Sequence, residues 1–109
     1  MEVLTAKYEY GEDSLKITLS GEIDHHSVKA VREDIDREIY RRCAKRVVLD
    51  LSKVGFMDSS GLGLVLGRYT HTKEAGGILT VLDPCPNAER VLKMAGVEKI
   101  IPIVFTGKQ

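Results

Sequence analysis

The sequence lacks an excess of charge, a long apolar run and a leader-like beginning. Sixteen lysines and arginines balance sixteen aspartates and glutamates, so the basic surface that a nucleic-acid-binding protein needs is missing. No apolar run approaches the roughly 18 residues of a membrane span. The first ten residues already carry Glu2, Lys7 and Glu9, which is not the pattern of a signal peptide. We therefore expect a cytoplasmic protein with neither a nucleic-acid nor a membrane partner.

Cysteine is also scarce. Cys43 and Cys85 form no CxxC pair and fit no metal-ligand spacing. Without a secretory signal, reduced thiols are the expected state. We assign no chemistry to either residue.

The motifs of catalysis and nucleotide binding are absent or incomplete. No serine stands in a Gly-x-Ser-x-Gly elbow, and no Gly-Lys-Ser/Thr completes a P-loop. Gly61, Gly63 and Gly67 form G-x-G-x-x-x-G, with Asp83 at the end of the next predicted strand, but the third glycine is one place late for a dinucleotide fingerprint. We predict no cofactor and no catalytic residue, and we expect the glycines to allow close packing of a helix on the sheet.

The length of 109 residues is that of one domain, which we assign to residues 1–109. Hydrophobic residues make up 43% and charged residues 29%, the composition of a soluble globular protein. A chain of this size can bury a core without disulfides or metals.

The hydrophobic pattern predicts strands that alternate with helices. The two N-terminal runs, separated by 11–13, form an antiparallel hairpin, and Gly21 is expected to end the second. The later elements form right-handed βαβ units, which gives an α/β fold with a mostly parallel sheet of four to five strands, an antiparallel N-terminal edge hairpin and helices packed on it. Pro102 makes the last strand an edge strand. The expected elements are strands 3–10 and 15–19, a helix from 28 to about 42, a strand 47–51, a loop 52–58, a helix 59–75, a strand 78–82, a helix over 88–95 and a strand 100–105.

Charge is distributed unevenly along the chain. Residues 29–46 hold seven bases and four acids. Cations are favoured near the C-terminal end of a helix, so this block is predicted to be a solvated helix face. A docking patch for an acidic partner is the alternative.

The segment 56–63 places Ser59 and Ser60 at the start of a helix that follows the carboxyl end of a strand, where functional groups of α/β sheets collect. Unpaired backbone N–H groups and the positive end of the helix dipole suit a capping serine. They equally suit a phosphoserine, which carries a charge of roughly −1.5 to −2. The residues alone leave both roles open.

A second polar cluster is formed by Asp24, His25 and His26. Adjacent histidines chelate a metal poorly and His71 is distant in sequence, so we predict no metal site. Asp24, or alternatively Ser27, is placed to cap the following helix. If the preceding strand neighbours the central strand, the Asp24 loop and Ser59 would share one surface.

Three runs, 21–26, 56–63 and 66–69, resemble the STAS domain, which is named for sulfate transporters and anti-sigma factor antagonists. The resemblance extends from the first hairpin to about Val104. The Asp-His-His loop and the Leu-Gly-Arg-Tyr run are similar to the subtype of spore-forming bacteria that controls sigma F. General-stress antagonists resemble the chain too, but usually lack the paired histidines and often have Ser-Thr for Ser-Ser. Family members commonly end with a further helix, for which 106–109 leave little room, so we expect one sheet face to be less covered.

The resemblance implies a binding module that is switched by phosphorylation and is not an enzyme. The unmodified protein would bind an anti-sigma factor that is also a serine kinase, and so free a sigma factor. The partner would use ATP to phosphorylate the serine directly after the aspartate of the motif, here Ser59, and a serine phosphatase would reverse the step. A small nucleotide-binding α/β domain is the alternative from another functional class. We assign partner binding to the two motif loops, at Asp24, His25, His26, Asp58, Ser59, Ser60, Gly61 and Leu62.

Overall fold

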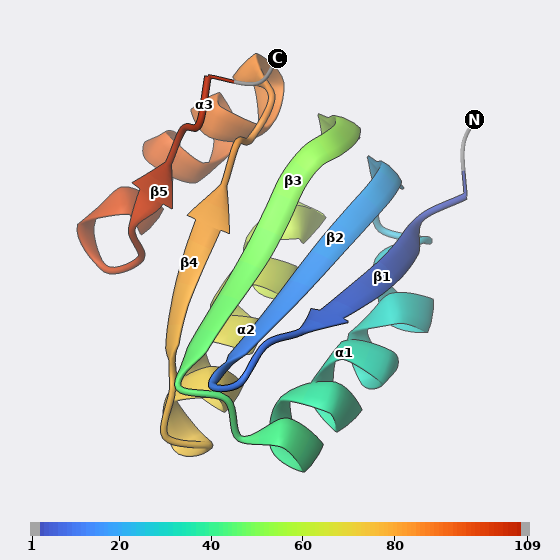
Figure 1. Cartoon of the computed structure of the whole chain (residues 1–109). Coiled ribbons are helices and arrows are strands. Elements are labelled where there is room, and N and C mark those ends of the chain that lie inside the picture. The colour runs from blue at the N-terminus through green and yellow to red at the C-terminus, as the bar shows by residue number, and fades with distance from the viewer. Residues whose placement is uncertain (1–2, 108–109) are drawn as a thin grey trace.

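A five-stranded sheet with the spatial order β1-β2-β3-β4-β5 organises residues 3–107, which the computed structural model describes. β1 is antiparallel to β2, and the other neighbouring strands are parallel (Figure 1). The predicted α/β class, element order and edge hairpin are confirmed. The elements are β1 (Thr5–Tyr10), β2 (Ser14–Ile23), α1 (Val28–Arg42), β3 (Arg46–Met57), α2 (Ser60–Glu74), β4 (Ile78–Leu82), α3 (Pro86–Met94), a 3-10 turn (Val97–Lys99) and β5 (Ile103–Val104).

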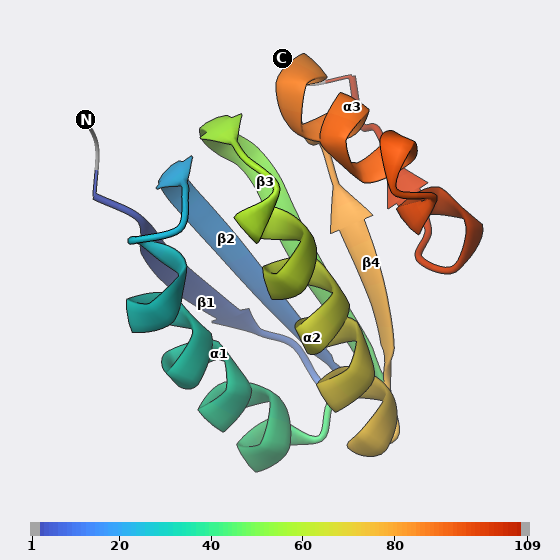
Figure 2. The ribbon, with the colours of Figure 1, turned by 180° about the vertical axis from the view of Figure 1, so that it is seen from behind.

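The α-helices of the described residues, α1, α2 and α3, lie on one face of the sheet (Figure 2). The core fills the space between them and the sheet. Leu15, Ile17 and Leu19 alternate along β2 and are fully buried there, which is the predicted strand periodicity. None of the helices in the described part of the chain is both long and apolar enough to cross a membrane.

The opposite face of the sheet carries no helix among residues 3–107 (Figure 1). A hollow of about 480 Å³ lies on it. This agrees with the expectation of a less covered sheet face. The hollow is lined by Lys16, Arg46, Val48, Ile78, Thr80, Leu82 and Val104.

β2 and β3 extend farther than predicted. Gly21 does not end β2, because the strand continues to Ile23 through register shifts against β3. Gly21 has φ +118°, and a Cβ there would lie 2.7 Å from the carbonyl oxygen of Val3, so the position requires glycine. The predicted loop 52–58 is also wrong, since β3 runs on to Met57 with β2 as its partner.

The last strand is shorter than predicted. β5 contains only Ile103–Val104, although it is an edge strand as expected. Ile101 donates its backbone N–H to the carbonyl of Val97 at 2.9 Å, which places it in a turn, and Pro102 has no N–H to donate. The ladder therefore starts only after Pro102.

Candidate functional site

Ser59 lies exposed at the N-terminal end of α2. It occupies the N-cap position, but its side chain makes no capping hydrogen bond. Asp58 satisfies the helix end in its place, because its Oδ1 accepts the backbone N–H of Ser60 at 2.8 Å. The hydroxyl of Ser59 has no hydrogen-bond partner within residues 3–107. The capping role that the sequence left open for Ser59 is thus performed by its neighbour.

Because Asp58 satisfies the helix end, the hydroxyl of Ser59 is accessible to solvent and is not needed for capping. Its side chain points from a helix start, where unpaired backbone N–H groups and the helix dipole favour an anion. A phosphate attached there would need no hydrogen bond of the native structure to break.

The Asp24 loop is held by a compact set of hydrogen bonds. Oδ1 of Asp24 accepts the backbone N–H of Ser27 at 2.8 Å and of His26 at 3.0 Å. The hydroxyl of Ser27 donates to the carbonyl of Glu22 at 3.0 Å and accepts the N–H of Asp24 at 2.9 Å. The Ser27 side chain makes no capping bond to α1, whereas the Asp24 carboxylate accepts the N–H groups of the turn that leads into the helix. The N–H donors, that of Ser27 foremost, hold the pKa of Asp24 below its ordinary value, so its carboxylate is ionised at neutral pH.

The Asp24 loop and the Ser59 segment adjoin one another, as the parallel-strand argument predicted. β2 and β3 are neighbours, and the N–H of Asp58 donates to the carbonyl of Ile23 at 3.0 Å. His25 and His26 are exposed beside Asp24, with their ring centroids 5.6 Å apart. In the described part of the chain, no group of three His, Cys, Asp or Glu side chains could hold a metal ion.

Gly61 brings α2 close to the sheet. The residue is buried, and a Cβ at this position would collide with the side chain of Met57. The predicted packing role is confirmed for Gly61. It is wrong for Gly63 and Gly67, where a Cβ would meet nothing within 4 Å. Leu62 is half-buried and packs against the core.

Asp83, the acid considered for a dinucleotide ribose, already binds protein groups. Its carboxylate accepts the backbone N–H of Thr106 at 2.8 Å and the hydroxyl of Thr106 at 2.6 Å. It therefore fastens the segment after β5 to the end of β4. This occupation argues against the dinucleotide interpretation.

Sequence reasoning missed Asn87. Its Oδ1 accepts the backbone N–H of Met57 at 2.7 Å, from a position in the first turn of α3. A polar residue after Pro86 looks like an ordinary solvated residue of a helix start, so the sequence carries no signal for this contact.

The basic block 29–46 spans most of α1, the turn after it and the first residue of β3. Arg37 pairs with Asp34 at 2.9 Å and Arg41 pairs with Glu38 at 2.8 Å, each one turn apart. This local pairing favours the solvated helix face over the docking patch.

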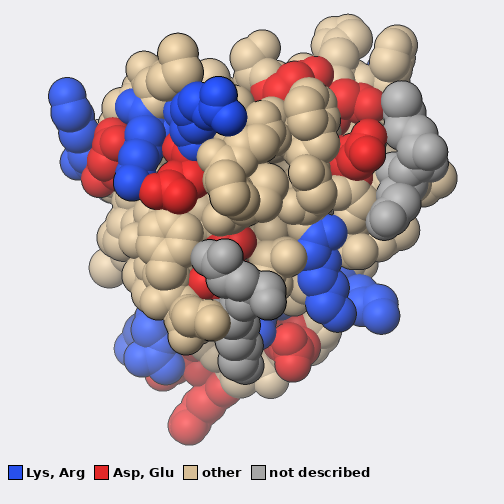
Figure 3. Space-filling view, turned by 90° about the horizontal axis from the view of Figure 1, so that it is seen from above, with Lys and Arg blue, Asp and Glu red and all other residues tan. Residues whose placement is uncertain are grey.

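The carboxyl ends of the parallel strands lie at one end of the molecule, which Figure 3 shows from above. Residues other than Lys, Arg, Asp and Glu form a continuous area on part of this end, and charged side chains lie on either side of that area (Figure 3). Such a surface suits protein contact, since charged residues are depleted at interface centres.

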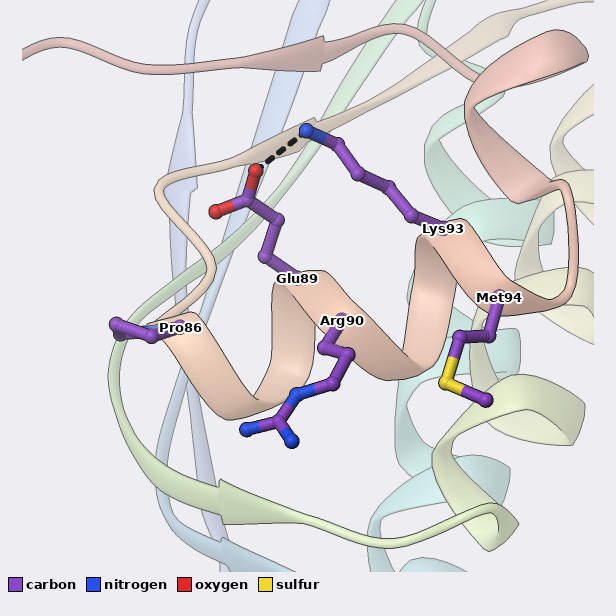
Figure 4. Close-up of a pocket in the computed structure, with 5 residues that line it drawn as sticks. All are labelled: Pro86, Glu89, Arg90, Lys93 and Met94. Carbon is purple, nitrogen blue, oxygen red and sulfur yellow. Dashed lines mark hydrogen bonds and ion pairs between the residues drawn. The ribbon is translucent and has the colours of Figure 1, made fainter.

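A hollow of about 450 Å³ runs along α3. Glu89 and Lys93 point toward one another from one side of the helix, whereas Arg90 and Met94 project from the other side (Figure 4). Pro86 completes the lining. None of the predicted site residues lines this hollow, and we assign no ligand to it.

Comparisons with known proteins give consistent results. The profile of the STAS domain family matches residues 6–107, which include both loops of the site. The chain is 44% identical over 100 residues to the anti-sigma F factor antagonist of Paenibacillus polymyxa, covering 92% of this chain and 86% of that protein. It is similar to the solved structure of the anti-sigma factor antagonist SpoIIAA in its unphosphorylated form, with a TM-score of 0.78, 30% identity, and coverage of 92% and 88% of the two chains. For the phosphorylated form of SpoIIAA, a Bacillus cell fate determinant, the TM-score is 0.71 at 30% identity, with coverage of 92% and 91%.

Proposed function

The chain belongs to the STAS domain family, as its three motifs predicted, and from this we propose that it is an anti-sigma factor antagonist controlled by phosphorylation of Ser59. The unphosphorylated form binds an anti-sigma factor that is also a serine kinase, and thereby releases a sigma factor. Phosphorylation ends the binding, and a serine phosphatase restores it. The chain itself acts as a binding module in the cytoplasm and performs no catalysis.

The observation that carries this proposal is the free hydroxyl of Ser59. It is exposed, unpaired among the described residues and located beside the Asp24 loop at the carboxyl ends of β2 and β3. A kinase can reach such a hydroxyl without unfolding any element. The solved phosphorylated form of the related SpoIIAA supports the same regulation here.

The modification is a phosphoryl transfer from ATP bound to the partner. The Oγ of Ser59 forms a bond to the γ-phosphorus as the bond from that phosphorus to the bridging oxygen breaks, and ADP leaves. The hydroxyl proton passes to a base of the kinase or to solvent. The phosphatase step adds water to the phosphoserine, which returns the hydroxyl and releases inorganic phosphate.

The phosphate weakens binding through charge. An interface built to accept the Ser59 hydroxyl would have to bury a dianion beside the carboxylate of Asp58. Burial of an unpaired charge costs several kcal/mol, which corresponds to a loss of affinity on the order of a thousandfold. No large change of fold is required.

The partner surface combines the two adjoining loops. Asp24 offers a fixed carboxylate, and His25 and His26 offer exposed rings beside it. The other loop contributes Asp58, Ser59 and Ser60 at the helix start, together with the half-buried Leu62. Gly61, which we also assigned to this surface, is buried against Met57 and supports the loop from within. The charge on Asp24 fits a basic group of the partner.

We further propose that the sigma factor released is sigma F, in sporulation. The Paenibacillus polymyxa relative, named an anti-sigma F factor antagonist, supports this assignment, together with the Asp-His-His loop. A general-stress antagonist of the same family is the alternative, and it would prefer an anti-sigma B factor as partner. Measuring the affinity of the chain for an anti-sigma F and an anti-sigma B factor decides between them.

The experiment that tests the function is incubation with an anti-sigma F factor and ATP, followed by mapping of phosphate by mass spectrometry. We expect one phosphate, on Ser59, and release of the phosphorylated chain from the complex. Ser59→Ala should remain bound and unmodified, whereas Ser60→Ala is the matched control that is still phosphorylated. Phosphate on Ser60, or none at all, would refute the assignment. ATP binding by the chain alone would favour the nucleotide-binding alternative.

A further inference from the structure

The end of β3 that leads to Ser59 is paired with a neighbouring strand on one side only. β3 pairs with β4 only as far as Asp50 and Leu82, whereas it pairs with β2 as far as Met57 and Ile23. A buried backbone amide without a hydrogen-bond partner costs free energy comparable to a lost hydrogen bond. Beyond Asp50, a buried amide on the side of β3 that faces away from β2 therefore needs another acceptor, and Met57 is fully buried.

Beyond the end of the β4 pairing, two side chains accept hydrogen bonds from backbone amides of β3. The N–H of Ser52 donates to Oδ1 of Asp50 at 2.9 Å, and the N–H of Met57 donates to Oδ1 of Asn87 at 2.7 Å. The first bond is local, but the second joins β3 to α3 across 30 residues of sequence. Its donor, Met57, is also the residue that directly precedes Asp58 in the chain.

Asn87 is itself held by a fixed element. The residues Ala88 and Leu92 on the inner side of α3 are fully buried. The first turn of the helix is closed by the N–H of Glu89, which donates to the carbonyl of Cys85 at 2.8 Å. A side chain on such a helix can hold a backbone group precisely, because its own position is set by core packing.

We propose that Asn87 is a positioning residue that determines where the chain presents the Ser59 hydroxyl. Asn87 holds Met57 from the α3 side, and the carbonyl of Ile23 holds the N–H of Asp58 from the β2 side. The end of β3 is thus clamped between two elements, and only Asp58 separates the Asn87 contact from Ser59. The effect on switching rests on the proposed phosphorylation of Ser59, while the clamp itself is tested independently.

Three variants separate positioning from stability. Asn87→Leu keeps a side chain of similar size but removes the acceptor. Asn87→Asp keeps an Oδ acceptor, and a carboxylate is tolerated in the first turn of a helix. Glu89→Gln is the matched control on the same helix, since it removes only the exposed ion pair with Lys93.

Phosphorylation kinetics with an anti-sigma F kinase and ATP give the functional readout, at a temperature where circular dichroism shows every variant folded. A misplaced acceptor lowers the rate of transfer, so we expect Asn87→Leu to reduce kcat by about tenfold or more while KM stays within about twofold. Asn87→Asp should recover the rate of the parent chain, and Glu89→Gln should not change it. A merely structural role of Asn87 would lower the melting temperature and leave kcat unaltered.

Hydrogen exchange of the Met57 amide in the free protein tests the clamp. Asn87→Leu should accelerate exchange at Met57 by about tenfold or more, with the amide of Leu49 in the middle of β3 as the internal control. Unchanged exchange at Met57, or a parental kcat for Asn87→Leu, overturns the inference. If exchange accelerates but the parent chain is never phosphorylated, the clamp holds, and the proposed function and its positioning consequence both fail.

Discussion

The guanidinium of Arg68 in α2 and the carboxylate of Asp36 in α1 form a two-point ion pair between the two helices. Nε of Arg68 lies 2.8 Å from Oδ1 of Asp36, and Nη2 lies 3.3 Å from Oδ2. Arg68 is only 2% exposed, and burial lowers its pKa against the opposing effect of Asp36. His71 contacts the same carboxylate, with Nδ1 2.8 Å from Oδ1. The helix that carries Ser59 at its start is thus tied to α1 by a charge pair in its middle.

Asp36→Asn is expected to destabilise the fold strongly. It leaves the buried guanidinium of Arg68 without its counter-charge, which costs about 3 kcal/mol in the free energy of unfolding. The matched control is Asp34→Asn on the same helix, whose pair with Arg37 is exposed and contributes at most about 1 kcal/mol. Urea unfolding of both variants measures the difference. Equal losses would mean that the Arg68 pair contributes no more than a surface pair.

The stability of the α2 start should depend on Asp58 and not on Ser59. Asp58 accepts the N–H of Ser60, so Asp58→Ala should lower the free energy of unfolding by about 1 kcal/mol. Ser59 makes no capping bond, and Ser59→Ala should change it by less than about 0.5 kcal/mol. Chemical denaturation of the two single variants provides the comparison. A loss for Ser59→Ala as large as that for Asp58→Ala would show that its hydroxyl caps the helix in solution.

β2 and β3 extend beyond their predicted limits. The additional residues are extended because they pair with a neighbouring strand, although their hydrophobic pattern is not that of a strand. The stretch 52–55 contains Ser52, Lys53 and Gly55 and only one apolar residue, so it resembles a loop. It is extended because β2 continues beside it and because the Asp50 carboxylate accepts the amide of Ser52. β2 continues through Gly21, where a side chain would collide with the backbone of Val3. Contacts of this kind join distant segments and leave no periodic signal.

The charge of Asp24 should contribute to partner binding separately from its role in the turn. Asp24→Asn keeps an oxygen that can accept the amides of Ser27 and His26, whereas Asp24→Ala removes both the charge and the turn. We expect both variants to weaken binding of the anti-sigma factor, and only Asp24→Ala to disturb the amide signals of the loop. Calorimetric titration and amide spectra measure the two effects. Full affinity of Asp24→Asn would limit Asp24 to holding the turn.

The buried hydroxyl of Tyr8 should reduce stability at high pH. Burial raises the pKa of Tyr8 to about 12, with Asp34 and Glu38 adding to the shift. A group with a raised pKa in the folded state stabilises the fold below its ordinary pKa of 10.0, and that contribution is lost as the pH rises toward 12. Unfolding measured between those pH values should show the loss.

Tyr8→Phe is the test of that cause. The Tyr8 hydroxyl of the parent chain has no hydrogen-bond partner within residues 3–107. Tyr8→Phe should therefore be at least as stable as the parent at neutral pH, and it should lose less stability in alkali. Tyr10→Phe is the contrasting variant, because it removes a hydrogen bond of 2.7 Å to Glu38 and should lower stability. Parental behaviour of Tyr8→Phe in alkali would assign the loss to other groups.

The location of the candidate site could be predicted from the sequence, but the side-chain contacts that hold it in place could not. Parallel strands end at one edge of a sheet, so the pattern placed Asp24 and Ser59 on one surface on the condition that β2 neighbours β3, and the structure meets that condition. The pairing of Asp36 with Arg68 and the contact of Asn87 with Met57 were not predictable. Each joins two elements through side chains that, in the sequence, look like ordinary solvated helix residues.

Phosphorylation of Ser59 should act locally and leave the fold unchanged. Ser59 lies at a helix start that accepts an anion without rearrangement. Leu64 and Val65 bury the same helix in the core, so moving it would expose apolar surface at roughly 25 cal/mol per Å². The Arg68 pair with Asp36 opposes the same movement. The phosphate therefore changes the charge of the surface and not the position of α2.

The measurement is a comparison of amide chemical shifts with and without the phosphate. Changes should cluster at residues 56–64 and in the adjoining loop 23–27, which shares the hydrogen bond between Asp58 and Ile23. Ser59→Glu should reproduce them only in part, because a carboxylate carries less charge and fewer oxygens than a phosphate. Large changes throughout β1 or the C-terminal half of α1 would demonstrate a global switch. In that case the loss of binding could not be explained by charge at the interface alone, because the two loops themselves would have moved.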